Sequence, residues 1–375
     1  MTSRHVQLLK SIATCLLPLV SICFAILCGE AVFRVYYWTK DGIPAREWHR
    51  FFLGNFDGTM LDETLGWKAT ENYRANRAEK TKQGKSYVVT LSQNRYGFRQ
   101  FGEIGSDKFK ILILGDSFTH AREVSDSKTY YALLGRERPY EVFAYGVENY
   151  GTLQEYMILD RFFDLIKPDL LVWQYCYNDF ANNDPLMERR TMLHIDFRQR
   201  PYWSKGEIIR DMPSSILGKF RGLAYKYSRF IVFLLSRMDR LYAAYLLDSV
   251  EAEILRSGAQ HPDFRRAVRT TDELMATVRA RVGATPVVAF NCKAVEPYNA
   301  ALKNISGRHD IIFLDEIAEA VDFAARQGRD VFHADGAHWS EEGHKLVGEM
   351  LVKRLEEFRV NRSLYRYREA AAPPN

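Results

Sequence analysis

The stretch that decides the fold is Ile111-Leu112-Ile113-Leu114-Gly115-Asp116-Ser117-Phe118-Thr119. Four consecutive aliphatic residues predict a buried strand, and Gly115-Asp116 predicts a tight turn after it. A serine placed directly after a buried strand can present its hydroxyl at the edge of the sheet, beside the amides that open the next helix. Ser117 is therefore a candidate nucleophile, although Gly-Asp-Ser alone is also an ordinary turn sequence.

Further apolar runs follow along the chain and are separated by amphipathic helical patterns. Continuous apolar strands that alternate with helices predict a parallel sheet covered on both faces. We therefore expect a three-layer α/β/α domain with a five-stranded parallel sheet. Its other strands are expected at Val142–Tyr145, Leu170–Tyr175, Val287–Phe290 and Ile311–Leu314, and its clearest helices at 153–165, 268–282 and 340–358.

A second polar group lies near the C-terminus, in Asp335-Gly336-Ala337-His338-Trp339-Ser340. An aspartate and a histidine three residues apart, in a loop that leads into a helix, can share one polar pocket. The carboxylate can then hold the imidazole as a base for a serine from elsewhere in the chain. Asp335 and His338 are therefore the candidate partners of Ser117.

Gly146 and Asn178 stand at the ends of the second and third predicted strands. Ligands bind at the carboxyl ends of the strands in such sheets, so both residues are expected close to Ser117. Their amides, together with the backbone amide of Ser117, would make a three-donor oxyanion hole. Each residue taken singly is equally well explained as a turn former after a strand.

These four blocks, which carry Ser117, Gly146, Asn178 and the pair Asp335 and His338, resemble in their order the SGNH hydrolase superfamily, also called GDSL esterases and lipases. The resemblance spans roughly residues 108 to 358 and implies a flavodoxin-like three-layer fold. It also implies that Ser117, Asp335 and His338 form a catalytic triad, and that Ser117, Gly146 and Asn178 form the oxyanion hole.

The preceding region resembles the membrane-anchored bacterial branch of that superfamily, through Leu65-Gly66-Trp67 and Asn94-Arg95-Tyr96-Gly97-Phe98-Arg99. This branch implies an ester on a glycan as substrate. The chain departs from many relatives after Thr119, where His120-Ala121-Arg122 replaces an apolar residue and a glycine. We interpret His120 as a solvated loop histidine, with substrate contact as the alternative.

Other polar residues are interpreted as structural. Asp116 is expected to cap its turn, and His194 with Asp196 lacks the further ligands that a metal site needs. An ordinary polar loop near the site is expected for Asp179, Asn182 and Asn183. Neither a metal nor an organic cofactor is expected, because acyl transfer through a triad requires none.

The N-terminus carries nineteen uncharged residues from Ser11 to Gly29, preceded by Arg4 and Lys10. At ~1.5 Å per residue such a helix reaches across a bilayer core of ~30 Å. The aromatic cluster at 35–38 then falls at the interface, and the basic N-terminus favours an N-in orientation. We expect a single-pass anchor in the inner membrane with a periplasmic catalytic domain. The alternatives are a cleaved signal peptide, a lipoprotein and a buried core helix.

The composition is that of an ordinary globular protein, with 47% hydrophobic and 26% charged residues among 375. The net charge of +5 comes without a basic stripe interleaved with aromatics, so no nucleic-acid partner is expected. Cys176 and Cys292 lie at the ends of two expected neighbouring strands. Two buried thiols are the default interpretation, and a disulfide is the alternative in an oxidising compartment. The oligomeric state is not indicated.

Four segments follow from these patterns. They are a cytoplasmic stub and transmembrane anchor (1–40), a small β-rich accessory region (41–107), the hydrolase domain (108–360) and a flexible tail (361–375). An insertion at 185–265 begins with a hairpin around Tyr202–Ile209 and is basic and apolar. We expect it to cover the active-site mouth as a lid or to rest on the anionic membrane surface, with a plain subdomain as the alternative.

The leading functional hypothesis is hydrolysis of an ester, such as the O-acetyl groups of an extracytoplasmic polysaccharide. O-acyl transfer to a glycan is an alternative, because the same acyl-enzyme can react with a sugar hydroxyl instead of water. Lipase or thioesterase activity is a second alternative, and a catalytically idle glycan-binding scaffold is a third. Against the scaffold, each catalytic position carries the residue that the chemistry needs.

Overall fold

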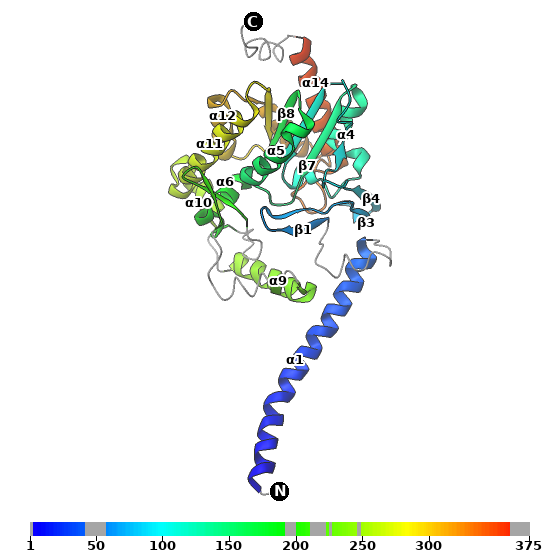
Figure 1. The fold of residues 1–375 in the computed structure, drawn as a ribbon, viewed down its shortest axis with the longest axis vertical. Coiled ribbons are helices and arrows are strands. Elements are labelled where there is room, and N and C mark those ends of the chain that lie inside the picture. The colour runs from blue at the N-terminus through cyan, green and yellow to red at the C-terminus, as the bar shows by residue number, and fades with distance from the viewer. Residues whose placement is uncertain are drawn as a thin grey trace.

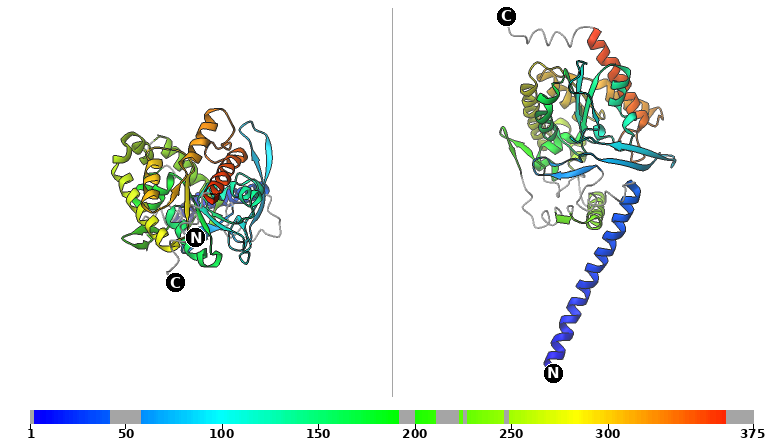
Figure 2. Two further views of the ribbon diagram at one scale, coloured as in Figure 1. Left: turned by 90° about the horizontal axis from the view of Figure 1, so that it is seen from above. Right: turned by 45° about the vertical axis from the view of Figure 1, so that its right-hand side comes forward.

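The computed structural model describes residues 3–41, 58–191, 200–210, 223–224, 227–245 and 249–360. A long helix, α1 (Ser3–Asp41), extends away from a layered α/β domain (Figures 1 and 2). The centre of the domain is a six-stranded sheet with strand order β12-β11-β8-β6-β7-β5. These strands are β5 (Gln100–Phe101), β6 (Lys110–Gly115), β7 (Glu141–Gly146), β8 (Leu170–Tyr175), β11 (Val287–Asn291) and β12 (Ile312–Phe313).

Helices cover both faces of this sheet, because successive side chains of each strand point to opposite sides. Leu112 and Leu114 of β6 belong to one buried cluster, and Ile111 and Ile113 belong to a second cluster on the other face. The first cluster lies under α5 (Thr152–Ile166), α11 (Pro262–Val282) and α12 (Tyr298–Arg308). The second lies under α4 (Tyr130–Glu137), α13 (Asp315–Arg326) and α14 (Glu341–Val360). The predicted three-layer α/β/α architecture is confirmed.

The sheet contains the five predicted parallel strands and one more. Strand β5 pairs antiparallel with β7, placing Gln100 opposite Ala144 and Phe101 opposite Phe143. The expected purely parallel, five-stranded sheet is therefore corrected to a mixed sheet of six strands. A strand of two residues is too short to show a periodic pattern, which explains why the sequence does not reveal it.

Two hairpins precede the main sheet and pack at the carboxyl edge of its strands. They are formed by β1 (Thr59–Asp62) with β2 (Gly66–Ala69), and by β3 (Arg74–Lys80) with β4 (Ser86–Ser92). The buried Trp67 ties the first hairpin down, because its Nε1 donates to the Glu148 carbonyl at 2.9 Å. The Tyr150 hydroxyl donates in return to the Trp67 carbonyl at 2.7 Å.

Helix α1 contains a segment, Leu16–Tyr36, with a mean hydropathy of 2.2 and none of it buried. By length and composition it is able to cross a membrane. The alternative of a buried core helix for this region is therefore wrong.

The described parts of the insertion comprise a hairpin and several helices. As predicted, strands β9 (Tyr202–Ser204) and β10 (Glu207–Ile209) pair around a turn at Lys205 and Gly206. Both turn residues have positive φ. The helices of the insertion include α7 (Pro185–Glu188), α9 (Arg229–Tyr245) and α10 (Val250–Ser257). Helix α9 packs on α1. That the insertion covers the active-site mouth as a lid stays a prediction. His194, Asp196 and the tail at 361–375 lie outside the described residues.

Candidate active site

The nucleophile candidate stands on a tight turn between β6 and the short helix α3 (Ser117–His120). Asp116 caps α3, because its Oδ1 accepts the Phe118 backbone N–H at 3.0 Å, as interpreted from the sequence. A side chain at Gly115 would place its Cβ 2.4 Å from Gln174 Oε1, so only glycine allows the turn to pack this closely. Ser117 is left half-buried at the carboxyl edge of the sheet.

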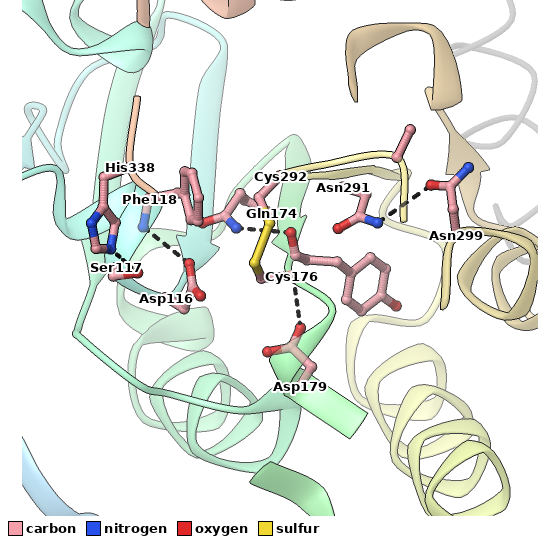
Figure 3. Close-up of a disulfide and its surroundings, with 12 residues drawn as sticks. Asp116, Ser117, Phe118, Gln174, Cys176, Asp179, Asn291, Cys292, Asn299 and His338 are labelled. Atoms are coloured by element: carbon pink, nitrogen blue, oxygen red, sulfur yellow. Dashed lines mark hydrogen bonds between the residues drawn. A yellow bond between two sulfur atoms is a disulfide. The ribbon is translucent and has the colours of Figure 1, made fainter. Parts of the chain in front are cut away.

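The structure brings the three triad candidates into one hydrogen-bonded chain. His338 Nε2 lies 3.0 Å from Ser117 Oγ, and His338 Nδ1 lies 2.7 Å from Asp335 Oδ2. Figure 3 shows the imidazole edge facing the serine hydroxyl. The other Asp335 oxygen accepts the backbone N–H groups of Ala337 and His338, at 2.8 and 3.1 Å. Gly336, at φ 73°, closes the turn that places the aspartate under its histidine.

The surroundings stabilise the imidazolium form of His338. Burial lowers the pKa of His338, but the hydrogen bond to Asp335 and the nearby carboxylates raise it to about 9. Burial also raises the pKa of the Asp335 carboxyl, yet hydrogen bonds from His333 and His338 hold it well below its usual range. The pair is therefore an ionised carboxylate beside a histidine that binds its proton tightly.

A second carboxylate, Glu123, faces the same histidine and was not found from the sequence. Its Oε1 lies 3.7 Å from His338 Nδ1, and its side chain is 7% exposed. Burial raises the pKa of Glu123, whereas the charges of His338 and Arg122 lower it. Within the described residues, Glu123, Asp335 and His338 are the one set close enough for a metal ion, but the 2.7 Å hydrogen bond suits acid–base pairing instead.

The two oxyanion candidates lie on the strands that flank β6. Gly146 is paired in register with Gly115, and a Cβ on Gly146 would lie 2.3 Å from the His120 backbone nitrogen. Asn178 opens α6 (Asn178–Asn183) directly after β8. Its side chain donates a hydrogen bond to the Asp116 carboxylate, which places Asn178 beside the residue that precedes Ser117. Burial raises the pKa of Asp116, whereas this bond lowers it. Both residues therefore lie at the edge of the sheet that carries Ser117.

The interpretation of His120 as a solvated loop residue is wrong. His120 is fully buried, its Nε2 lies 3.1 Å from Gln93 Nε2, and burial lowers the pKa of its imidazole to about 3. The accessory hairpins cover it, a long-range contact that its neighbours in sequence do not reveal.

The polar loop expected after Asn178 is instead the buried helix α6. Asp179 Oδ2 accepts the Cys176 backbone N–H at 3.1 Å, and Asn183 Nδ2 donates to Thr271 Oγ1 at 3.0 Å. Asn182 donates to the Tyr150 carbonyl at 3.2 Å. These side chains hold the site's scaffold together.

Cys176 and Cys292 form a disulfide between the segments that follow β8 and β11, with the two sulfur atoms 2.13 Å apart. The default of two buried thiols is thus corrected. Their backbones are also joined, because Cys292 N–H donates to the Tyr175 carbonyl at 2.8 Å. Figure 3 shows the bridge beside the turn that carries Ser117, so it ties together two of the strand ends that frame the site.

A protein-family model described as the GDSL-like Lipase/Acylhydrolase family matches residues 113–346. A search of curated proteins finds no match. Among solved structures, a lipase/acylhydrolase from Enterococcus faecalis is 17% identical, with 66% of this chain and 96% of that chain covered and a TM-score of 0.36. A G-D-S-L family lipolytic protein from Veillonella parvula is 11% identical, with 65% and 97% covered and a TM-score of 0.38.

Proposed function

This chain belongs to the GDSL-like lipase/acylhydrolase family and is a hydrolase that acts on ester bonds, and from this premise we propose that Ser117, His338 and Asp335 are its catalytic triad. The observation that supports the proposal is the continuous chain of hydrogen bonds from Ser117 Oγ through both imidazole nitrogens to the Asp335 carboxylate. A nucleophile, a base and a group that orients the base are the parts that acyl transfer requires.

In the proposed reaction, Ser117 Oγ attacks the ester carbonyl carbon while His338 Nε2 takes the hydroxyl proton. Asp335 accepts a hydrogen bond from the Nδ1–H and stabilises the resulting imidazolium. When the tetrahedral intermediate collapses, the proton on Nε2 passes to the departing alkoxide, and the acyl group stays on Ser117. A water molecule activated by the same nitrogen then releases the carboxylic acid and restores the serine.

We assign the oxyanion hole to the backbone amides of Ser117 and Gly146 and to the side-chain amide of Asn178. These donors come from the ends of three adjacent strands, so the rigid sheet sets their positions before substrate binds. Donors that need no reorganisation stabilise the developing oxyanion most effectively.

We propose O-acetyl groups on an extracytoplasmic polysaccharide as the substrate. Asp335 and His338 are 36% and 27% exposed, so a small acyl group carried on a bulky polymer can reach the site. A cavity of about 300 Å³ lies between the β3–β4 hairpin and the loop at 330–340 that carries Asp335 and His338, here called the catalytic loop. Its lining combines the rings of Tyr87 and Phe332 with polar side chains such as Lys85, a mixture that suits a sugar ring.

The test uses the full chain in detergent and its Ser117→Ala variant. A fluorophosphonate probe should label the wild type but not the variant. Acetate should be released from an acetylated polysaccharide and from p-nitrophenyl acetate, and p-nitrophenyl palmitate should react much more slowly. Label retained by folded Ser117→Ala would refute the triad, and acetyl groups moved onto an added unacetylated glycan would indicate transfer. An unlabelled, folded wild type would point to the scaffold.

We further propose that α1 crosses the inner membrane with its N-terminus in the cytoplasm and that residues from about 40 onward are periplasmic. The Cys176–Cys292 disulfide supports this placement, since such bonds persist in oxidising compartments. Alkaline phosphatase fused after Lys40 should be active in cells. If it stays inactive while a cytoplasmic reporter works at the same junction, the orientation is reversed.

A further inference from the structure

Helix α9 (Arg229–Tyr245) packs against the C-terminal part of the candidate membrane span. The Phe33 ring of α1 lies 5.6 Å from the Phe230 ring and 4.6 Å from the Phe233 ring, measured between centroids. A side chain at Gly29 would place its Cβ 2.8 Å from the Phe230 ring, so the glycine makes room for this contact. Figure 1 shows α9 below the catalytic domain, with one end next to the upper part of α1.

A polar clamp fixes the start of α9 to α1. Glu30 Oε2 accepts hydrogen bonds from Ser228 Oγ at 2.8 Å and from the Phe230 backbone N–H at 3.0 Å. Glu30 Oε1 pairs with Arg34 Nε, and Arg34 Nη2 donates to the Tyr227 carbonyl at 2.9 Å. A carboxylate is favourable at a helix N-terminus, and an ionisable residue inside an apolar span needs such partners.

The rest of the apolar face of α9 is exposed. Leu234, Met238 and Leu241 recur at helical spacing and are 43%, 62% and 60% exposed. At 3.6 residues per turn, this stripe adjoins the face that carries Phe230 and Phe233. The clamp residues Glu30 and Arg34 lie in the last turns of the Leu16–Tyr36 segment, so the stripe is held at the depth where that segment would leave a bilayer.

We propose that α9 is an interfacial helix, whose stripe of Leu234, Met238 and Leu241 inserts among the phospholipids of the outer leaflet around α1. The proposal rests on α1 crossing the membrane, and it does not depend on the esterase chemistry. Continuity of the stripe with the span identifies lipid as its partner, and apolar side chains buried at the headgroup boundary bind by this mode in other interfacial helices. With two attachments, the domain would be held in one orientation at the surface.

Depth-dependent quenching tests the proposal in the full chain, reconstituted in vesicles of phosphatidylcholine and phosphatidylglycerol. Cys15, Cys23 and Cys28 are changed to Ser, and the NBD fluorophore is attached through Met238→Cys. The matched control is Phe323→Cys on α13, an apolar position that is 58% exposed. We expect the label at 238 to emit at shorter wavelength and to be quenched by lipids with a nitroxide near the headgroup, and the label at 323 to do neither.

The outcomes distinguish a failure of the interfacial-helix proposal from a failure of the proposed membrane span. If the protein stays with the vesicles through an alkaline carbonate wash but the label at 238 is exposed to water, the interfacial helix is refuted and the membrane span is not. Protein released by the wash would overturn the membrane span and the proposal with it. Glu30→Ala, with circular dichroism to verify folding, should abolish the quenching at 238 without releasing the protein. Unchanged quenching would refute the clamp.

Discussion

Replacing Glu123 by glutamine should shift the pH at which the enzyme becomes active. The change keeps the size of the side chain and removes its negative charge, 3.7 Å from His338 Nδ1. Two unit charges at that distance interact by about 4.5 kcal/mol at an effective dielectric constant of ~20, which is an upper limit here. Burial raises the pKa of Glu123 and Arg122 offsets its charge, so we expect the pKa of His338 to fall by only about 1 unit.

The sign follows from the form of histidine that acts as the base. In the proposed mechanism only neutral His338 can take the Ser117 proton, so a pKa of about 9 should make activity rise toward alkaline pH. If the pKa falls from about 9 to about 8, the neutral fraction at pH 7.5 rises about eightfold. The kcat/KM of Glu123→Gln at that pH should therefore increase by up to that factor, reduced by the weaker basicity of the imidazole.

The assay is p-nitrophenyl acetate hydrolysis by the full chain between pH 6 and 10, with Ser117→Ala as the blank for spontaneous hydrolysis. The apparent pKa in kcat/KM reports the free enzyme. Glu79→Gln is the matched control, because Glu79 faces His333 Nε2 at 3.9 Å instead of His338. A profile that stays in place for Glu123→Gln, or moves to higher pH, would show that Glu123 does not set the proton affinity of the histidine.

The remaining predictions concern the triad, the disulfide and a buried histidine. Ser117→Ala should lower kcat by roughly 10⁴–10⁶, and Asn178→Ala should lower it by roughly 10²–10³, with unchanged circular dichroism; equal losses would contradict the assigned roles. The double change Cys176→Ser/Cys292→Ser should lower the free energy of unfolding by about 2–5 kcal/mol in urea titrations, since the bridge closes a long loop. His344 is buried and its pKa is lowered to about 3, so the stability it confers is present above pH 6.5 and declines as the pH falls below that value. Thermal unfolding of His344→Gln should therefore depend less on pH between 6.5 and 4 than that of the wild type.

Much of the architecture was predictable because it is encoded locally. The five apolar runs each mark a parallel strand, and the polar residues just after them meet at one edge of the sheet. Ser117, Gly146 and Asn178 lie at this edge because their strands are neighbours in the order β8-β6-β7. Each taken singly also fits an ordinary turn, so their assignment to one site came from the family resemblance. The spacing of Asp335 and His338 in front of the last helix made them candidates, and the resemblance gave them their expected roles.

What escaped prediction depends on contacts between distant segments. Glu123 and His120 look like ordinary loop residues, yet they are buried because the hairpins of the accessory region fold over them. The Tyr87 hydroxyl donates to the Glu123 carbonyl, and Gln93 meets His120. A sequence pattern reports which face of an element is apolar, but it does not report which other segment will cover a loop.

The contact between the β3–β4 hairpin and the catalytic loop has a consequence for biogenesis. Gln83 binds Asp330, 247 positions later, and Ser117 meets His338 across 221 positions. If the chain is exported N-terminus first, as proposed, the hairpin and the serine cross the membrane before the histidine that they meet. The proposed triad could then assemble only after His338 has been translocated, so a chain stalled before that residue would remain without esterase activity.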